Sequence, residues 1–453
     1  MTGTMYEAAK TVVLTFLVLV SIVLTFVLWT YHPKYDVLQN DEYVQNVSVS
    51  NTQVDPAMIV QPSQLLFHKN NAHYGIVQEE EANQILKEIK KWSIDDFENI
   101  SDTIPKGKFL SFLHEKERLE LVYPDSIPID VYRSIFQIED KGIKHISFDR
   151  IIIPLANKDE LSIYFISTEK RRVYKAIATD VSLSEINKLA MELDEYPRYF
   201  PYVINETKQI FLPEKEVTMN RLQYYTDELD SDKFKEALFS DPSFVKKDLI
   251  TFGEEYTDGS RLMDVDFLQR MLLYVNPAAR TLNGSENQKN DHLIQKSIDF
   301  VNEHGGWTDM YRFARWNEDE RTVVFRLIVN NHPVFNEYGM SEIVQIWGSS
   351  DLVKYQRPLF RLEVADRVNV PRTLLSGHEV IKKIEMMEGF KKELVKDIVV
   401  GYELIKDPER EKVIILEPSW FCLYGQTWKK IPLDDQEKEQ DSKKRGGNVS
   451  GLE

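Results

Sequence analysis

An uncharged apolar stretch near the start of the chain constrains its architecture more than any other feature. Residues Thr11 to Trp29 read TVVLTFLVLVSIVLTFVLW and contain no charged side chain. At about 1.5 Å rise per residue, a helix of this length reaches about 28 Å, close to the thickness of the hydrocarbon core of a bilayer. The stretch therefore predicts a transmembrane helix over residues 11–31, preceded by a cytoplasmic N-terminus of residues 1–10.

The residues around this stretch favour an uncleaved anchor over a signal peptide. A signal peptide has a shorter apolar region followed by small residues at a cleavage site, whereas Trp29 and Tyr31 are bulky and suit the headgroup layer. Lys10 precedes the span, and Lys34 after it is soon followed by acidic residues at positions 36, 41 and 42. This charge bias predicts a single-pass protein of the cell membrane with the bulk of its chain extracytoplasmic.

Weakly polar side chains gather on one face of the predicted span. At 100° per residue, Thr11, Thr15, Ser21 and Thr25 fall within one arc of about 120°. Such a face lets a second helix approach closely and share hydrogen bonds in lipid, which makes these residues candidates for partner contact. The alternative is that each hydroxyl bonds a carbonyl of its own helix and faces lipid without a partner. The sequence leaves both open.

Composition excludes some partners and one kind of stabilisation. Residues 1–34 hold one acidic and two basic side chains, so residues 35–453 carry a formal charge of −18 out of the total of −17. Nucleic acid and anionic lipid surfaces are therefore poor partners for the exterior. The single cysteine, Cys422, excludes an intramolecular disulfide, so the exterior must be stabilised by packing.

Hydrophobic patterns after the anchor predict an α+β fold with mainly antiparallel sheets and packed helices in several domains. The predicted divisions are a juxtamembrane stalk (32–57), three extracytoplasmic domains (58–200, 201–317 and 318–432) and a disordered tail (433–453). Predicted helices include residues 78–92, 128–136, 183–193 and 232–239, and predicted strands include 58–60, 109–113, 119–123, 146–155, 161–167, 172–178, 217–225, 261–266, 271–275, 310–316, 322–329, 398–405 and 413–424.

Motifs for chemistry are present only in fragments. Ser167 with Lys170, and Ser243 with Lys246, match the Ser-x-x-Lys of penicillin-binding proteins, but the companion motifs are missing. The closest histidine pair, His68 and His73, does not have the spacing of a helical zinc site. We therefore predict no catalytic, cofactor-binding or metal residue. The alternative is a wall hydrolase or transferase that uses a carboxylate pair, drawn from Glu254, Glu255, Asp258, Asp264 and Asp266.

An aromatic and arginine-rich segment is a stronger candidate for contact than for catalysis. It begins at Trp307 and continues through Arg312, Arg315 and Trp316 along a predicted strand. Core packing on one face and solvent on the other explain the pattern simply. Alternatively, these four residues form a surface for a protein partner, because Arg and Trp dominate interface energetics.

Several segments in order along the chain resemble one known family. They are TVVLTFLVLVSIVLT in the anchor, YTDGSRLMDVDF (256–267), NHPVF (331–335), YQRPLFRL (355–362) and EPSWFCLYG (417–425). Together with the chain length they are similar to the YycH (WalH) family, over the whole chain up to the tail. The resemblance implies a membrane-anchored accessory protein of the WalK/WalR (YycG/YycF) two-component system, which governs cell-wall metabolism in low-GC Gram-positive bacteria. It also implies a complex with the sensor kinase WalK and a YycI-like companion, and no catalytic residue or cofactor.

Overall fold

The structure, a computed structural model, describes one helix near the N-terminus and most of the chain after residue 51. The described residues are 13–25, 49, 52–133, 135–138, 146–155, 160–280, 293–349, 351–365 and 370–432. The chain divides into two compact units, Met1–Gln45 and Asn46–Glu453. The ends of the predicted span, the stalk up to residue 48 and the predicted tail lie outside the described residues. In the described part, no helix is both long and apolar enough to cross a membrane.

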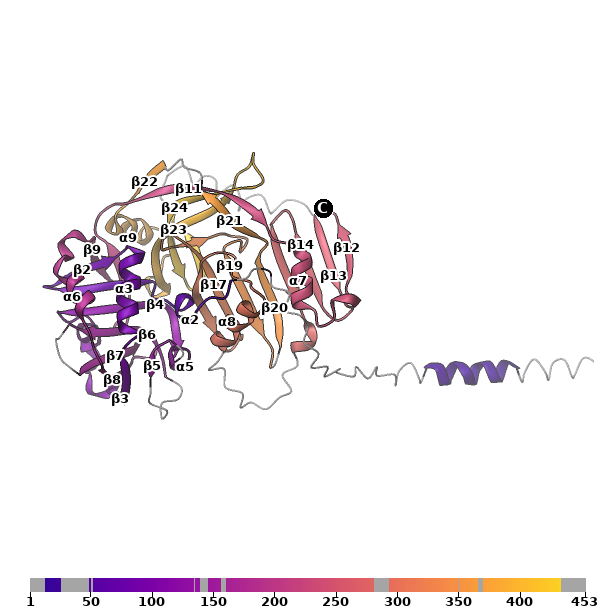
Figure 1. The fold of residues 1–453 in the computed structure, drawn as a ribbon, viewed down its shortest axis with the longest axis horizontal. Coiled ribbons are helices and arrows are strands. Elements are labelled where there is room, and N and C mark those ends of the chain that lie inside the picture. The colour runs from indigo at the N-terminus through magenta and orange to yellow at the C-terminus, as the bar shows by residue number, and fades with distance from the viewer. Residues whose placement is uncertain are drawn as a thin grey trace, which may run out of the picture. The chain divides into compact units, whose positions relative to one another are not determined.

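A ten-stranded sheet opens the second unit and is drawn in indigo to magenta in Figure 1. Its order is β10-β9-β2-β1-β4-β6-β7-β8-β3-β5, and all neighbours are antiparallel except β3 and β5. The strands are β1 (Gln64–Lys69), β2 (Ala72–Ile76), β3 (Ser93–Asn99), β4 (Arg118–Pro128), β5 (Gln137–Ile138), β6 (Ser147–Pro154), β7 (Leu161–Ser167), β8 (Arg172–Thr179), β9 (Arg198–Val203) and β10 (Gln209–Pro213).

A fifteen-stranded sheet follows and runs from pink to yellow in Figure 1. Its main path is β12-β13-β14-β15-β20-β19-β17-β18-β23-β24-β11-β21, with β16, β22 and β25 attached at its sides. The strands are β11 (Val217–Glu228), β12 (Lys246–Ile250), β13 (Gly253–Thr257), β14 (Leu262–Asp266), β15 (Met271–Val275), β16 (Tyr311–Asn317), β17 (Thr322–Val329), β18 (His332–Phe335), β19 (Glu342–Trp347), β20 (Leu352–Pro358), β21 (Phe360–Ala365), β22 (Val370–Leu374), β23 (Val395–Lys406), β24 (Val413–Tyr424) and β25 (Thr427–Lys430).

The sheets divide the chain at other places than the predicted domain boundaries. Strands β9 and β10 extend the first sheet to Pro213, so it continues past the predicted end at residue 200. The predicted boundary at 317/318 falls between β16 and β17, which pair with each other. The second and third predicted domains therefore share one sheet. The α+β class with mainly antiparallel sheets is confirmed.

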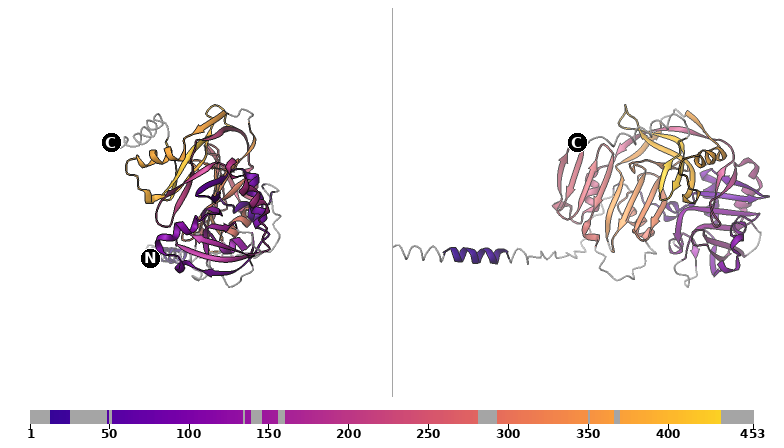
Figure 2. Two further views of the ribbon diagram at one scale, coloured as in Figure 1. Left: turned by 90° about the vertical axis from the view of Figure 1, so that its left-hand side faces the viewer. Right: turned by 180° about the vertical axis from the view of Figure 1, so that it is seen from behind.

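Helices cover the two sheets (Figures 1 and 2). The amphipathic helix α3 (Glu79–Ile89) begins with three glutamates, where the helix dipole favours negative charge, and buries Ile85 and Ile89. Its Glu88 carboxylate accepts the backbone N–H groups of Glu185 and Ile186 and so caps α6 (Ser184–Met191). The helices are α2 (Pro56–Ile59), α3 (Glu79–Ile89), α4 (Phe109–Leu113), α5 (Ile129–Arg133), α6 (Ser184–Met191), α7 (Ser231–Leu238), α8 (Leu293–Glu303) and α9 (Gly377–Glu385).

Two short apolar segments predicted as strands are helices. Residues 58 and 59 form the end of α2 and Val60 is its C-cap, because Asp55 accepts the N–H of Ala57 and Pro56 occupies the first helical position. Residues 109–113 form α4, in which Phe109 and Leu113 lie four residues apart and bury one face. In both cases a short apolar run fits either structure, and the tertiary contacts decide.

Candidate functional site

The weakly polar face of the N-terminal helix is described from residue 13 to residue 25. Thr15, Ser21 and Thr25 lie in this helix and are exposed, while Thr11 lies outside the described residues. The Thr25 hydroxyl donates to the Ser21 carbonyl oxygen at 2.8 Å. This bond is the local arrangement that the sequence allowed as the alternative to a helix partner. A hydroxyl bonded in this way still has a lone pair for a neighbouring helix.

The aromatic and arginine-rich segment makes its described contacts within the chain. Trp307 is 2% exposed and donates its indole N–H to the side chain of Asn302 at 2.9 Å. Arg312 is also buried and donates to the side chain of Asn331 at 2.6 Å and to Glu79 of α3 at 2.9 Å. The pair of Arg312 with Glu79 connects β16 of the second sheet with a helix of the first part of the unit.

Trp316 completes this junction between the two sheets. Its indole N–H donates to the carbonyl oxygen of Ser126 at 2.7 Å, and its backbone N–H donates to the carboxylate of Asp125 at 3.0 Å. Asp125 and Ser126 lie on β4 of the first sheet. Arg315 is half-buried beside Trp316, at a bulge in the pairing of β16 with β17. The residues predicted to bind another protein thus contact residues of their own chain. Their role in binding another protein stays a prediction.

A buried polar cluster in the first sheet was not predicted from the sequence. The strands β1 and β2 place His68 directly opposite His73, and their Nδ1 atoms are 2.7 Å apart. His68 Nε2 lies 2.8 Å from Glu120, which also accepts from Arg150 at 2.7 Å. His114 Nε2 lies 3.4 Å from the same carboxylate. The signal available in the sequence was Asn70-Asn71, a turn dipeptide whose hairpin brings the two histidines together.

Glu120 and Arg150 form an ion pair within this cluster. Burial would raise the pKa of Glu120, but Arg150 and the histidine contacts hold it well below its ordinary value. Burial lowers the pKa of His68, and burial together with His68 lowers the pKa of His73 to about 4. Neutral His68 then donates from Nε2 to Glu120 and accepts from His73 Nδ1–H, so each contact has one donor. No group of side chains able to hold a metal ion is found in the described part of the chain.

The Ser-x-x-Lys matches do not bring their side chains together. The Ser243 hydroxyl donates to Asp241 at 2.5 Å, while Lys246 pairs with Asp248 at 2.6 Å. Ser167 is buried, and the ammonium group of Lys170 donates to Ser147 at 3.3 Å. Neither lysine is therefore placed as a base for its serine.

Glu254 and Asp258, two acidic residues of the alternative hydrolase, have hydrogen-bond partners that fix them in the fold. Glu254 accepts from Ser231 and Tyr256 at 2.7 Å each. Asp258 accepts backbone N–H groups in the tight turn that contains Gly259 at φ +87°. The other three stand on the opposite face of the β13–β14 hairpin: Glu255, Asp264 and Asp266.

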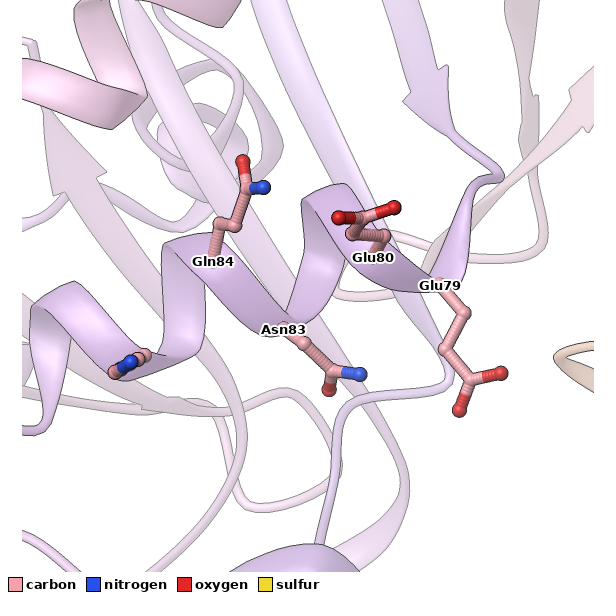
Figure 3. Close-up of a pocket in the computed structure, with 5 residues that line it drawn as sticks. Glu79, Glu80, Asn83 and Gln84 are labelled. Atoms are coloured by element: carbon pink, nitrogen blue, oxygen red, sulfur yellow. The ribbon is translucent and has the colours of Figure 1, made fainter.

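Two shallow depressions of the surface adjoin α3 rather than these carboxylates. The side chains that line the first, among them Glu79, Glu80, Asn83 and Gln84, spread outward from the helix instead of converging on one point (Figure 3). The second continues toward α6 and includes Glu88 and Trp92. Side chains that spread apart in this way do not position a reactive atom.

Residues in the segments that carry the family resemblance build the second sheet. Arg357 has no exposed surface and donates to the carbonyl oxygen of Gly306 at 2.7 Å. Phe335 on β18 stacks on Phe421 with ring centroids 4.1 Å apart, and Trp420 beside it is fully buried. These side chains specify the fold rather than a reactive centre.

Comparison with known proteins gives matches along the chain. The models of the N-terminal and C-terminal domains of YycH protein match residues 7–197 and 207–438. The chain is 27% identical over 430 residues to the two-component system WalR/WalK regulatory protein YycH of Bacillus subtilis (strain 168), covering 91% of this chain and 94% of that protein. The crystal structure of YycH from Bacillus subtilis matches with a TM-score of 0.74 and 26% identity, covering 85% of this chain and 100% of that one.

Proposed function

Since the chain belongs to the YycH family, we propose that it is a membrane-anchored regulatory protein of a WalR/WalK-type two-component system. In this role it modulates the sensor kinase WalK (YycG), together with a YycI-like companion, and so affects cell-wall metabolism. The observation that carries the proposal is the extent of the match to a regulatory relative, which runs along nearly the whole of both chains.

Contacts rather than chemistry are the proposed means of action. Among the candidate reactive groups, Ser243, Glu254 and Asp258 are engaged in hydrogen bonds of turns and of the contact between α7 and β13. A regulator of this kind acts by a difference in affinity for two states of the kinase. Contacts in the membrane and contacts of the exterior are both able to supply that difference.

The membrane contact is proposed for the span over residues 11–31. Its apolar length suits a bilayer, and the side chains described between residues 13 and 25 are exposed. If the face of Thr11, Thr15, Ser21 and Thr25 packs on a kinase or companion helix, interhelical hydrogen bonds there contribute about 0.6 kcal/mol each on average. With the lost packing, replacing all four by leucine is expected to cost about 2–4 kcal/mol, which lowers complex occupancy roughly thirty- to several hundredfold.

Co-purification of the full-length chain with WalK and the companion from membranes tests the proposed function. The matched control replaces Val13, Val20, Val23 and Val27 by leucine, which keeps the span apolar but changes other faces. We expect the leucine variant of the polar face to lose association and to alter a WalR-dependent reporter, and the control to keep both. Absence of any association by the unaltered chain would refute the regulatory proposal, whereas equal effects of the two sets would refute only the specific helix contact.

A further inference from the structure

The second sheet ends at an exposed edge strand. Strand β12 pairs with β13 and, within the described residues, with no other strand. Every residue of β12 except Asp248 is exposed. The ends of the first sheet differ, because β10 is buried throughout and β5 has two residues. Burial and shortness are the usual ways to keep an edge from pairing, and β12 uses neither.

The backbone of β12 offers hydrogen bonds to a further strand. A two-residue turn joins β12 to β13, and Ile250 is paired with Gly253 across it. In such a hairpin the flanking pair exchanges hydrogen bonds and the bonded pairs then alternate along the strands. The N–H and C=O groups of Lys247 and Leu249 therefore point away from β13.

Large apolar side chains gather at one end of this edge. Exposed fractions are 79% for Leu249, 47% for Ile250 and 59% for Phe252 in the turn. The adjacent β14–β15 turn adds Phe267 and Leu268, which are 52% and 56% exposed. The N–H of Phe267 donates to the carbonyl oxygen of Phe252 at 2.9 Å, so the two turns lie side by side. Contiguous exposed apolar side chains of this kind mark interaction sites.

The alternative to a docking role is that the lysines on β12 keep this edge from pairing, because lysine commonly protects an exposed edge strand. Here, however, both lysines are paired within the sheet. Lys246 lies 2.6 Å from Asp248, and Lys247 lies 2.9 Å from Glu254. Nearby carboxylates thus offset the charge of both lysines. Protection of the edge from pairing also does not explain why large apolar side chains are exposed beside these lysines.

A row of carboxylates next to the edge indicates the charge of a partner. Asp248, Glu255 and Asp264 are directly opposite one another on β12, β13 and β14. Lys246, which pairs with Asp248, offsets only one of these three charges, and like charges in this arrangement disfavour each other. Burial, followed by the charge of Asp266, raises the pKa of Asp264. A second copy paired about Asp248 would add another carboxylate to the row. A strand with a basic side chain at that position would relieve it.

We propose that β12 is a docking edge for an extended segment of a partner protein. The segment adds to the sheet as its next strand, with a lysine or arginine opposite Asp248 and apolar side chains opposite Leu249 and Ile250. Main-chain hydrogen bonds give affinity in this mode, and alternate side chains give specificity. The inference deepens the proposed function and rests on it, because it names a surface through which such a regulator contacts another protein.

A labelled peptide of about nine residues that repeats lysine-valine-valine is the probe, because it can place a lysine opposite Asp248 and valines opposite Leu249 and Ile250. A peptide that repeats glutamate-valine-valine is its counterpart. Titrated against the full chain in detergent, the lysine peptide is expected to bind about tenfold more tightly. The double variant Asp248→Lys with Glu255→Lys is expected to reverse this preference, which loss of folding could not do. Leu249→Asp with Phe252→Asp is expected to abolish binding, and Met386→Asp, at a residue 83% exposed elsewhere, is the matched control.

Several results would overturn the docking edge. One is that the two peptides bind equally well. Another is that the chain binds phosphatidylcholine vesicles and Phe252→Asp abolishes this binding. A third is that the chain is a dimer in solution and Leu249→Asp makes it a monomer. Co-purification separates this inference from the proposed function. If the Leu249→Asp, Phe252→Asp variant keeps WalK and the companion as the unaltered chain does, the docking edge is refuted and the function stands. If the unaltered chain retains neither protein, the function fails and the peptides alone decide the edge.

Discussion

We expect Glu120→Gln to lower the free energy of unfolding by about 3 kcal/mol, at the lower end of the range for breaking a buried ion pair. Glu120 has no exposed surface and accepts from Arg150 at 2.7 Å and from His68 at 2.8 Å. Glutamine keeps the shape and one acceptor oxygen, but its amide nitrogen faces a donor. It leaves the Arg150 cation buried without a counter-charge, which is the main cost.

The double variant Glu120→Gln with Arg150→Met isolates this cause. Because it removes the unpaired cation, it is expected to recover about 2 kcal/mol relative to Glu120→Gln alone. Denaturant unfolding of the full chain in detergent, followed by tryptophan fluorescence, gives the shift in midpoint for each variant. A Glu120→Gln chain within about 1 kcal/mol of the original, or a double variant no more stable than the single one, would contradict the assignment of charge in the cluster.

Three further predictions concern other parts of the exterior. Because the pKa of His73 is lowered to about 4, the unfolded chain takes up a proton at this residue below pH 6.5. The contribution of His73 to stability is therefore full above pH 6.5 and falls by at most about 1.4 kcal/mol per pH unit between pH 6.5 and 4. His73→Asn should remove this part of the slope in unfolding titrations, whereas His68, whose pKa burial also lowers, keeps its own part. Gly401→Ala is expected to cost about 1–3 kcal/mol, since its Cβ would lie 2.4 Å from the carbonyl oxygen of Pro333, whereas Gly107→Ala, with nothing within 4 Å, should be near neutral in the same assay. Trp316→Phe removes the bond to Ser126 and should lower stability by about 1–3 kcal/mol because a carbonyl is left unpaired; an unchanged thermal midpoint would count against a structural junction.

Strands with a strong apolar pattern were predictable residue by residue. The predicted strands 271–275, 322–329 and 413–424 coincide with β15, β17 and β24. Their β-branched and aromatic residues fit a pleated surface, and an asparagine or a glycine follows each strand. Since packing and propensity favour the same structure there, a single sequence is sufficient.

Predictions for short segments were wrong or missing where capping and turn residues decide the structure rather than the apolar pattern. The Asp55-Pro56 pair starts a helix at α2, and the asparagines of Asn70-Asn71 adopt φ angles of 50° and 62° between β1 and β2. Both signals were in the sequence, as an N-cap with proline and as a hairpin dipeptide. With the hairpin in place, His68 falls opposite His73, so the histidine pair was also within reach of the sequence.

The contacts of residues such as Trp316 and Arg312 could not be predicted from the sequence, because they involve residues distant along the chain. Trp316 and Arg312 are residue types common at interfaces, and in the structure they bond to Ser126 and Glu79 of the same chain. Composition states that such groups need a desolvated partner, but it does not state which chain supplies it. The same limit holds for β12, since which strand ends a sheet is decided by the pairing of all the others. An exposed surface of a regulator is therefore best sought where the completed sheet leaves backbone groups and apolar side chains together, and β12 is such a place.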